Sequence, residues 1–483
     1  MKKPFLTLFC VLILCSTAFA EDIYIAQTEQ GEGAGTSCAE AESAAWFNTA
    51  ANWGGGAGEI DAGDTAYLCD DGGDFTTRLA TQLTGSDGNR ITITEGSGET
   101  VTMTDGITIS HDYITVDSIT LITNAVDCGS STGRTSVRVT GDHVTVSNNI
   151  ITGGAANTLQ YTQTADYGII TGNTIHDFYM NAINLQSTTG YHVVSYNEIY
   201  TGYCSECSGY EGDCNGIGYV GEDIIFEGNY IHDLITEENG GTVCNTSHTD
   251  ASQCYNDTGD PDCLNITFRY NLIWLEGCYS YANGQYTKGW ETGGGIDGLM
   301  VYGNIIRSFT GLHSGGDKSN NFTIINNSFI GYDDPDCGGN ETGIYVDLTT
   351  GGTNTIKNNI FIDWAENHVN YDDPEPTSGY NLTYNFDEST PDCSDSNADC
   401  QQTGDQHGVD PLFTAFGDDD FTLSSISPAK GGGVDLGNGL LYGLDPTSTW
   451  PDNVKPLDQD LYGDWEIGAF IYGPRRGMAF GGY

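Results

Sequence analysis

Basic side chains are scarce in this sequence, and three of them fall close together in its second half. The chain has 15 Lys and Arg residues against 67 Asp and Glu residues, in a total of 483. Lys288 and Lys318 lie on either side of His313. Because a Lys or His side chain can take a proton from a substrate, we predict that Lys288, His313 and Lys318 are catalytic.

Four acidic residues of the same region could hold a divalent cation beside these bases. They are Asp250, Glu291, Asp317 and Asp347. Carboxylate oxygens are ligands that calcium prefers, and a bound cation would stabilise negative charge on a reacting carboxylate. A base and a cation are what β-elimination of a uronate polymer requires. The plainer interpretation is that these residues form a solvated surface, as Lys, Asp and Glu usually do.

Amide and aromatic side chains are the usual partners of sugar hydroxyls and ring faces. Side chains of this kind occur at Asn184, Gln186, Gln253, Trp290 and Tyr345. A glycoside hydrolase would instead need two carboxylates about 5–10 Å apart. Neighbouring strands, roughly 4.8 Å apart, could bring such a pair together, but so acidic a chain forms pairs of this kind by chance.

One short phrase recurs eight times between Val144 and Phe361, and it predicts the elements that position these residues. Each copy has a β-branched or aromatic residue three positions before an Asn, and Ile or Phe two positions after it. The Asn residues are Asn149, Asn173, Asn197, Asn229, Asn271, Asn304, Asn327 and Asn359. Their irregular spacing, from 23 to 42 residues, is typical of a solenoid whose coils carry insertions.

The repeated Asn predicts a corner shared by all the coils. An Asn tolerates left-handed backbone geometry and therefore suits a bend between two strands. Stacked Asn side chains could bond to one another, since a buried amide left unsatisfied costs roughly 1–3 kcal/mol. A leucine-rich solenoid also has an Asn ladder, but Leu never occupies the flanking positions here. We therefore predict a parallel β-helix.

The repeat resembles that of the right-handed parallel β-helix superfamily of pectate lyases and related polysaccharide enzymes. The resemblance covers most of the chain after residue 20 and implies an all-β solenoid with an N-terminal cap and a C-terminal closing segment. It also implies a substrate groove along one strand face, here formed by the strands roughly 14–16 residues before each Asn, and we therefore predict substrate contacts from Asn184, Gln186, Gln253, Trp290 and Tyr345. The Asp-Pro-His-Asp run of alginate epimerases, the Asn-Thr-Asp and Asp-Asp motifs of polygalacturonases and the Arg-x-Pro-x-x-Arg signature of pectate lyases are absent.

Four segments are expected along the chain: a signal peptide (1–20), an N-terminal cap with the first strands (21–104), the β-helix (105–389) and a closing segment with a tail (390–483). Lys2 and Lys3, an apolar run and Ala18-Phe19-Ala20 are typical of a secretory signal. No later apolar run is long enough to span a membrane. We expect a secreted or extracellular protein, with a cell-surface location as an option.

Net charge and cysteine content limit the binding partners and the cell compartment that can be expected. A formal charge of -52 argues against binding nucleic acid or anionic membranes, and it makes a polyanionic substrate depend on cations. Solubility in a salty or calcium-rich medium is the simpler explanation. The 15 Cys residues predict disulfides in an exported protein. Cys38–Cys69 and Cys393–Cys400 are the expected pairs, and Cys204-x-x-Cys207 could bind zinc but has no matching second pair.

We therefore expect a chain that binds an extracellular polysaccharide and cleaves it, by calcium-assisted β-elimination rather than by hydrolysis. The alternative is a non-catalytic carbohydrate-binding, adhesive or structural surface protein. An enzyme should place Lys, His or Tyr beside acidic residues in one walled groove, whereas a structural protein should present a flat face.

Overall fold

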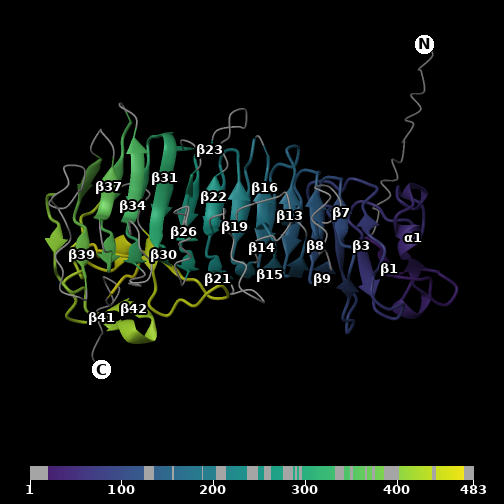
Figure 1. The fold of residues 1–483 in the computed structure, drawn as a ribbon. Helices are drawn as coiled ribbons and strands as arrows, with labels where there is room; N and C mark the ends of the chain where they lie inside the picture. Colours follow the sequence, from purple (N-terminus) through teal and green to yellow (C-terminus); the bar gives the residue numbers. More distant parts are fainter. Residues whose placement is uncertain are drawn as a thin grey trace, which may run out of the picture.

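The computed structural model describes most of the chain after the predicted signal peptide. The described residues are 20–123, 135–154, 157–187, 189–202, 214–235, 249–254, 263–275, 287–288, 291–292, 296–331, 342–348, 352–364, 367–371, 376–385, 402–437 and 442–472. They form three long parallel sheets stacked along one axis (Figure 1), and each coil adds a strand to sheet 1, sheet 2 and sheet 3 in turn. The predicted parallel β-helix is confirmed.

Sheet 1 contains the strands that precede the Asn corners. Its strands, in spatial order, are β2 (Glu42–Ser43), β1 (Asp22–Ala26), β3 (Thr65–Cys69), β5 (Ile91–Glu95), β8 (Ile114–Asp117), β11 (Thr145–Ser147), β14 (Ile169–Thr171), β17 (Val193–Ser195), β20 (Ile225–Glu227), β24 (Thr267–Arg269), β29 (Met300–Tyr302), β32 (Thr323–Ile325), β35 (Thr355–Lys357) and β38 (Thr377–Gly379). The predicted apolar positions lie in register here, for example Val146 beside Ile170 and Ile170 beside Val194, and they are buried.

Sheet 2 contains the strands that follow the Asn corners. They are β6 (Thr102–Met103), β9 (Thr120–Thr123), β12 (Ile150–Gly153), β15 (Thr174–Phe178), β18 (Glu198–Gly202), β21 (Tyr230–Ile235), β25 (Leu272–Trp274), β30 (Ile305–Ser308), β33 (Ser328–Gly331), β36 (Ile360–Ile362), β39 (Leu382–Tyr384) and β40 (Gln406–His407). The Ile and Phe residues two positions after each Asn line the interior, where Phe329 and Phe361 stack at 5.1 Å between ring centroids.

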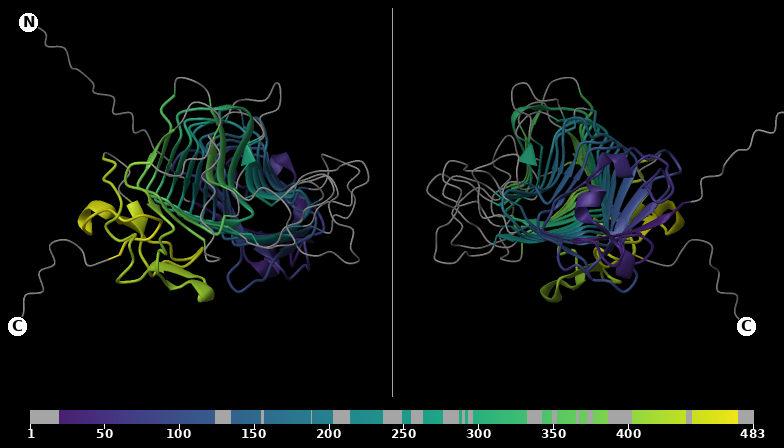
Figure 2. Two further views of the ribbon diagram at one scale, coloured as in Figure 1. Left: turned by 60° about the vertical axis from the view of Figure 1, so that its left-hand side comes forward. Right: turned by 90° about the vertical axis from the view of Figure 1, so that its right-hand side faces the viewer.

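Sheet 3 closes each coil and carries the strands predicted to form the groove. They are β4 (Leu79–Ala80), β7 (Ile107–Ile109), β10 (Val137–Val139), β13 (Asn157–Tyr161), β16 (Asn181–Leu185), β19 (Cys214–Tyr219), β22 (Thr249–Cys254), β26 (Thr287–Lys288), β27 (Glu291–Thr292), β31 (Thr310–Ser319), β34 (Thr342–Leu348) and β37 (Asn367–Tyr371). Figure 2 turns the stack so that successive coils overlap along its axis.

The eight Asn residues form one continuous ladder. Asn149 donates from its backbone N and from Nδ2 to Oδ1 of Asn173, both at 3.0 Å. Every later member repeats this pattern. The ladder continues beyond the prediction, because Asn359 bonds to Asn381 and the backbone N of Asn381 donates to Asp405 Oδ1 at 2.8 Å.

The corner geometry differs from the expectation in one respect. The left-handed residue is the one before each ladder Asn, such as Asn148 (φ 54°), Tyr196 (φ 54°) and Tyr270 (φ 60°). The ladder Asn itself is not left-handed, and its side chain is thereby free to point into the interior and bond the next coil. The Asn is selected for its amide rather than for its backbone tolerance.

The N-terminal residues cover the first coil while already contributing to sheet 1. The short helix α1 (Ala44–Phe47) begins at Ser43, whose hydroxyl accepts the backbone N–H of Trp46 at 3.1 Å. The predicted Cys38–Cys69 disulfide is present, whereas the predicted Cys393–Cys400 pair lies outside the described residues. Strands β1, β3 and β5 pair in parallel, so sheet 1 begins before residue 105.

The closing segment predicted for residues 390–483, of which 402–437 and 442–472 are described, is expected to cover the last coil. It does so through β40, which pairs with β39, but it then returns along the outside of sheets 1 and 2 (Figures 1 and 2). Trp450 Nε1 donates to the carbonyl of Tyr270 at 2.6 Å, and the backbone N of Ala469 donates to Ser328 Oγ at 3.3 Å. The hairpins β41 (Phe413–Ala415)–β42 (Asp420–Leu423) and β43 (Tyr442–Leu444)–β44 (Pro456–Asp458) belong to this returning segment.

Glu466 makes the stability of this segment sensitive to pH. Its carboxylate is buried and accepts backbone N–H groups of Gly431 at 2.6 Å and Tyr472 at 3.3 Å. Burial raises the pKa of Glu466 to about 7 in spite of these donors. Between roughly pH 4.5 and 7 the folded chain therefore binds this proton more tightly than the unfolded chain does, and the contribution of Glu466 to stability falls as pH rises.

We expect Glu466→Gln to remove this pH dependence. Between about pH 5 and pH 8 the free energy of unfolding of the variant should rise relative to the wild type by up to about 3 kcal/mol. A constant loss is expected beside this change, because the amide nitrogen of Gln cannot accept one of the two backbone N–H groups. Chemical unfolding at both pH values measures the difference, with exposed Glu32→Gln as the control. A difference between the wild type and the Glu466→Gln variant that stays the same at both pH values would contradict the assignment.

Candidate functional site

The outer face of sheet 3 carries two polar columns that run along the axis of the solenoid. In every rung but one, a first polar residue is followed by a second one three positions later; on β19 the second position is Gly218. The first column consists of Asn157, Asn181, Asn215, Asp250, Lys288, Thr310 and Thr342, and the second of Gln160, Asn184, Gly218, Gln253, Glu291, His313 and Tyr345. Neighbouring rungs therefore place these residues directly beside one another.

A bend between the two columns turns both toward the same side. The residue after each first-column position is left out of the paired register, and the next residue, such as Ile183, points into the core. The skipped position is often Gly: a Cβ on Gly216 would meet the carbonyl oxygen of Ala251 at 2.6 Å, and one on Gly311 would meet that of Gly343 at 2.3 Å. No side chain would fit at these positions, because the backbones of neighbouring strands approach each other closely there.

Amide groups connect the two columns in the early rungs. Asn157 Oδ1 accepts from Asn181 Nδ2 at 2.8 Å and from Asn184 Nδ2 at 2.9 Å. Asn215 Nδ2 donates to Asn181 Oδ1 at 3.1 Å and to Gln253 Oε1 at 2.9 Å. These cross-column bonds fix the side chains of four successive rungs as one network.

Asp250 lies at the end of this network and is fully buried, at 0% exposure. It pairs in register with Asn215 on one side and with the backbone of Lys288 on the other. Its strand is also held by the Cys254–Cys263 disulfide, which ties the end of β22 to β23 (Cys263–Leu264). A buried carboxylate is stable only where hydrogen bonds or a cation compensate its charge.

The second column changes character beyond Gln253. Glu291 lies in register with Gln253 on β22 and with His313 on β31, and His313 is in register with Tyr345 on β34. The rings of His313 and Tyr345 stack at 5.1 Å between centroids, with an angle of 22° between their planes. Both rings are half-buried, as Asn157 and Gln160 of the first rung are, whereas the amides of Asn181, Asn184, Asn215 and Gln253 are buried.

Other predicted residues lie elsewhere or can be placed only in part. Gln186 follows β16 and accepts from Gln160 Nε2 at 3.1 Å, so it belongs to the amide network rather than to the second column. Asp317 and Lys318 fall in the irregular part of β31, between Ser314 and Ser319. For Lys288, Glu291, Asp317, Lys318 and Asp347 only the backbone is described, and Trp290 lies outside the described residues.

The register separates the four carboxylates predicted to share a cation. In the register of sheet 3, Asp250 on β22 aligns with Lys288 on β26, then with Thr310 on β31 and then with Thr342 on β34. Asp347 follows Thr342 by five residues on β34. At about 3.3 Å per residue, Asp347 is roughly 16 Å further along the strand direction. Asp250 and Asp347 therefore cannot bind one ion, since calcium–oxygen distances are about 2.3–2.6 Å.

The remaining donors around Asp250 suit a hard cation by chemical type. Among the described residues no group of three or more His, Cys, Asp or Glu side chains could hold a metal ion. Amide oxygens are also calcium ligands, and Asn184 Oδ1 is buried without a hydrogen-bond partner within the described part of the chain. Asn184 itself lies two rungs from Asp250, roughly 10 Å away, so the amide oxygens that could join Asp250 are those of Asn215 and Gln253, with Glu291 on the adjacent rung.

Sequence reasoning missed Asn157, Gln160, Asn181 and Asn215 as members of the site. The signal was present as a polar pair with a spacing of three residues, repeated once per coil. It was missed because the side chains of a regular strand reach the same face at every second residue. That rule paired Asn184 with Gln186 instead of with Asn181.

Comparisons with known proteins identify the architecture. No protein-family model and no curated protein matches the chain. Among solved structures, the chain is similar to pectate lyase Pel9A, with a TM-score of 0.56 and 13% identity over 94% of this chain and 98% of that one. It also resembles a rhamnogalacturonan lyase (TM-score 0.40, 12% identity, 84% and 95% covered) and a GH136 lacto-N-biosidase from Eubacterium ramulus (TM-score 0.43, 12% identity, 75% and 63% covered).

The likeness to Pel9A extends over almost the whole of both chains, and a solenoid of opposite hand would not superimpose in this way. The predicted right-handed parallel β-helix is therefore confirmed. At 13% identity the likeness shows the fold alone, and the chemistry has to be argued from the residues of this chain.

Proposed function

We propose that this chain is a polysaccharide lyase that cleaves a uronate-rich glycan on the outer face of sheet 3. The observation that supports this most is the register of sheet 3. It aligns Gln253, Glu291, His313 and Tyr345 in one column and sets Lys288 beside a fully buried Asp250. A base next to a carboxylate that could bind a cation, beside partly exposed aromatic side chains, is the combination that elimination needs.

In this proposal Lys288 takes the proton from the carbon next to the uronate carboxylate. A carbon–carbon double bond then forms and the bond to the leaving glycosidic oxygen breaks, while His313 supplies the proton that this oxygen takes up. Tyr345 stacks on His313 and limits its ring to one orientation. Preorganised groups of this kind contribute to the rate because they need not reorder during the reaction.

Asp250 would hold calcium together with amide oxygens of the network, and Glu291 is the further carboxylate within one rung. Bound calcium would neutralise the uronate carboxylate and stabilise the charge that develops on it. This would also offset the repulsion between a polyanion and a chain with a formal charge of -52.

A hydrolase is the second candidate, because Asp250 and Glu291 are carboxylates on neighbouring rungs of the same face. The test is to incubate the wild-type protein with a panel of polyuronates and neutral glycans, with calcium or with a chelator. The proposal expects calcium-dependent appearance of the ultraviolet-absorbing unsaturated uronate at the new chain end. New reducing ends without this absorbance would favour the hydrolase, and no cleavage across the panel would favour a binding or adhesive protein.

Asp250→Asn should weaken the response to calcium. The concentration of calcium that gives half-maximal cleavage should rise by at least about tenfold, because calcium affinity depends on the number of charged ligands. The exposed residue Asp452 provides the matched control, and Asp452→Asn should leave the response unchanged. An unaltered calcium response in Asp250→Asn, with an unaltered unfolding midpoint, would remove Asp250 from the cation site.

A further inference from the structure

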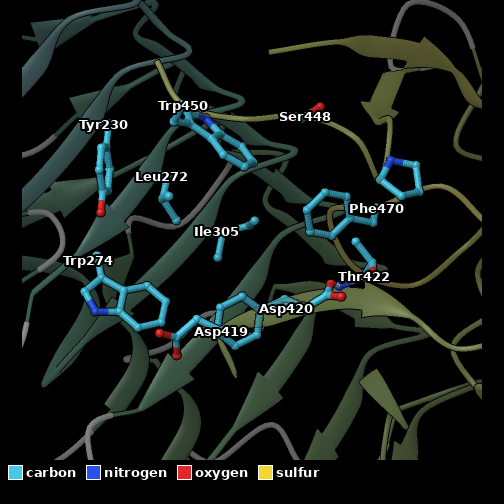
Figure 3. A pocket seen from close by; sticks show the side chains of 12 residues that line it. Tyr230, Leu272, Trp274, Ile305, Asp419, Asp420, Thr422, Ser448, Trp450 and Phe470 are labelled. Carbon is cyan, nitrogen blue, oxygen red and sulfur yellow. Dashed lines mark hydrogen bonds between the residues drawn. The ribbon is translucent and has the colours of Figure 1, made fainter. Parts of the chain in front are cut away.

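A second candidate site lies on sheet 2, away from the polar columns of sheet 3. A cavity of about 360 Å³ opens between the outer face of β21, β25 and β30 and the returning C-terminal segment (Figure 3). Its floor is Leu272 and Ile305, whose neighbours Ile273 and Ile306 point into the solenoid core. Ligand pockets in proteins are commonly about 300–1,000 Å³, so the cavity can take a sugar ring with its substituents.

Aromatic rings form the walls, and several are held in place by contacts outside the cavity. Trp450 is anchored by the bond from its Nε1 to the Tyr270 carbonyl, and it meets Phe470 edge-on at 6.5 Å between centroids. Trp274 lies 5.5 Å from Phe421 at 43°. Trp274 and Trp450 both remain partly exposed, and Figure 3 shows them bordering the space over Leu272 and Ile305.

The rim is polar and acidic. Asp420 Oδ1 accepts from the backbone N of Thr422 at 3.0 Å and from Thr422 Oγ1 at 2.6 Å, so its carboxylate is fixed in orientation. Asp419 is exposed next to it, and Ser448 lies on the opposite side of the cavity. Carboxylates and hydroxyls in fixed positions beside flat apolar surfaces match a pyranose, whose C–H faces are apolar and whose hydroxyls project around the ring.

The charges around the cavity distinguish a neutral sugar from charged ligands. Asp419 and Asp420 would repel an anionic sugar. A cation would be drawn to a ring and a carboxylate, but the chain supplies its own cation there: the Arg307 guanidinium lies 4.4 Å over the Trp274 ring, and Arg307 Nη1 is 3.7 Å from Asp419 Oδ1. We propose that this cavity binds an uncharged sugar residue of a neutral glycan, through apolar contacts with the cavity-lining parts of Trp274 and Trp450 and hydrogen bonds to Asp420.

The inference does not rest on the proposed lyase activity, since the two sites lie on different sheets and take sugars of different charge. The test is isothermal titration of the full chain with cellohexaose, mannohexaose and xylohexaose, with a uronate hexamer and choline as charged probes. Wild-type protein should bind at least one neutral oligosaccharide. Trp274→Ala should weaken that binding by at least about tenfold and leave glycan cleavage unchanged.

Because Trp450 also anchors the C-terminal segment, Trp450→Ala tests sugar binding only if its unfolding midpoint is unchanged. Asp420→Asn provides a second variant, in which packing is retained. Tyr191→Ala is the matched control, since Tyr191 is an exposed aromatic residue (42%) at a different corner. The proposal would be overturned if no neutral hexamer bound the wild type, if choline or the uronate bound instead, or if both Trp274→Ala and Asp420→Asn bound as the wild type does.

Discussion

Asn173→Leu is expected to lower the free energy of unfolding by about 3–5 kcal/mol. The substitution nearly preserves shape but removes the amide that joins three coils. Asn173 accepts from the backbone N and Nδ2 of Asn149, and its own Nδ2 donates to the Val146 carbonyl at 2.9 Å and to Asn197 Oδ1 at 2.9 Å. The buried N–H of Asn149 and the carbonyl of Val146 would lose these partners, and such groups cost roughly 1–3 kcal/mol each.

Chemical unfolding followed by circular dichroism measures this effect. Asn89→Leu is the matched control, because Asn89 is exposed and lies outside the ladder, and surface substitutions usually change stability by less than about 0.5 kcal/mol. If Asn173→Leu were no less stable than Asn89→Leu, the ladder would not contribute to stability as its geometry indicates.

Lys288→Ala is expected to have the largest effect on activity. If Lys288 is the base, cleavage of the polymer should fall by at least about a thousandfold, which lies within the range of roughly 10²–10⁴ for the loss of a general base. Folding should be unaffected, because the register of β26 depends on backbone bonds to β22 and β31 rather than on the side chain. Release of the unsaturated product, followed over time, measures the rate.

Lys357→Ala is the control for Lys288→Ala. Lys357 lies at the end of β35 in sheet 1, on a different side of the solenoid, so its removal should leave cleavage unchanged. Wild-type turnover in Lys288→Ala would exclude Lys288 from the mechanism, and an equal loss in both variants would indicate an effect of overall charge.

The fold could be predicted from the sequence because a repeated Asn side chain makes the same hydrogen bonds to the next coil each time. Eight ladder positions and their apolar flanks lie where the phrase placed them. Asn381 was missed because Ser378 and Thr383 occupy its flanking positions, which are apolar in the other coils. The left-handed corner residue was also misplaced by one, since Asn, Gly and Tyr all occur there and no single residue type marks it.

The candidate site was predicted less completely. The strands before each Asn are indeed one sheet, and Asn184, Gln253, Glu291, His313 and Tyr345 share one register on it. Their roles stay predictions. Two features could not be predicted from the sequence. One is the bend within each strand, which brings residues three positions apart to one face. The other is the distance along the strand direction that separates Asp347 from Asp250.

The most direct measurement of the central claim is a crystal structure of the Lys288→Ala variant with an oligosaccharide of the polymer that the wild type cleaves. We predict that the sugar chain lies over sheet 3, with one unit beside the stacked rings of His313 and Tyr345 and a carboxylate directed toward Asp250 and Glu291. An oligosaccharide bound only on sheet 1 or sheet 2, with the outer columns of sheet 3 uncontacted, would contradict the assignment of the site.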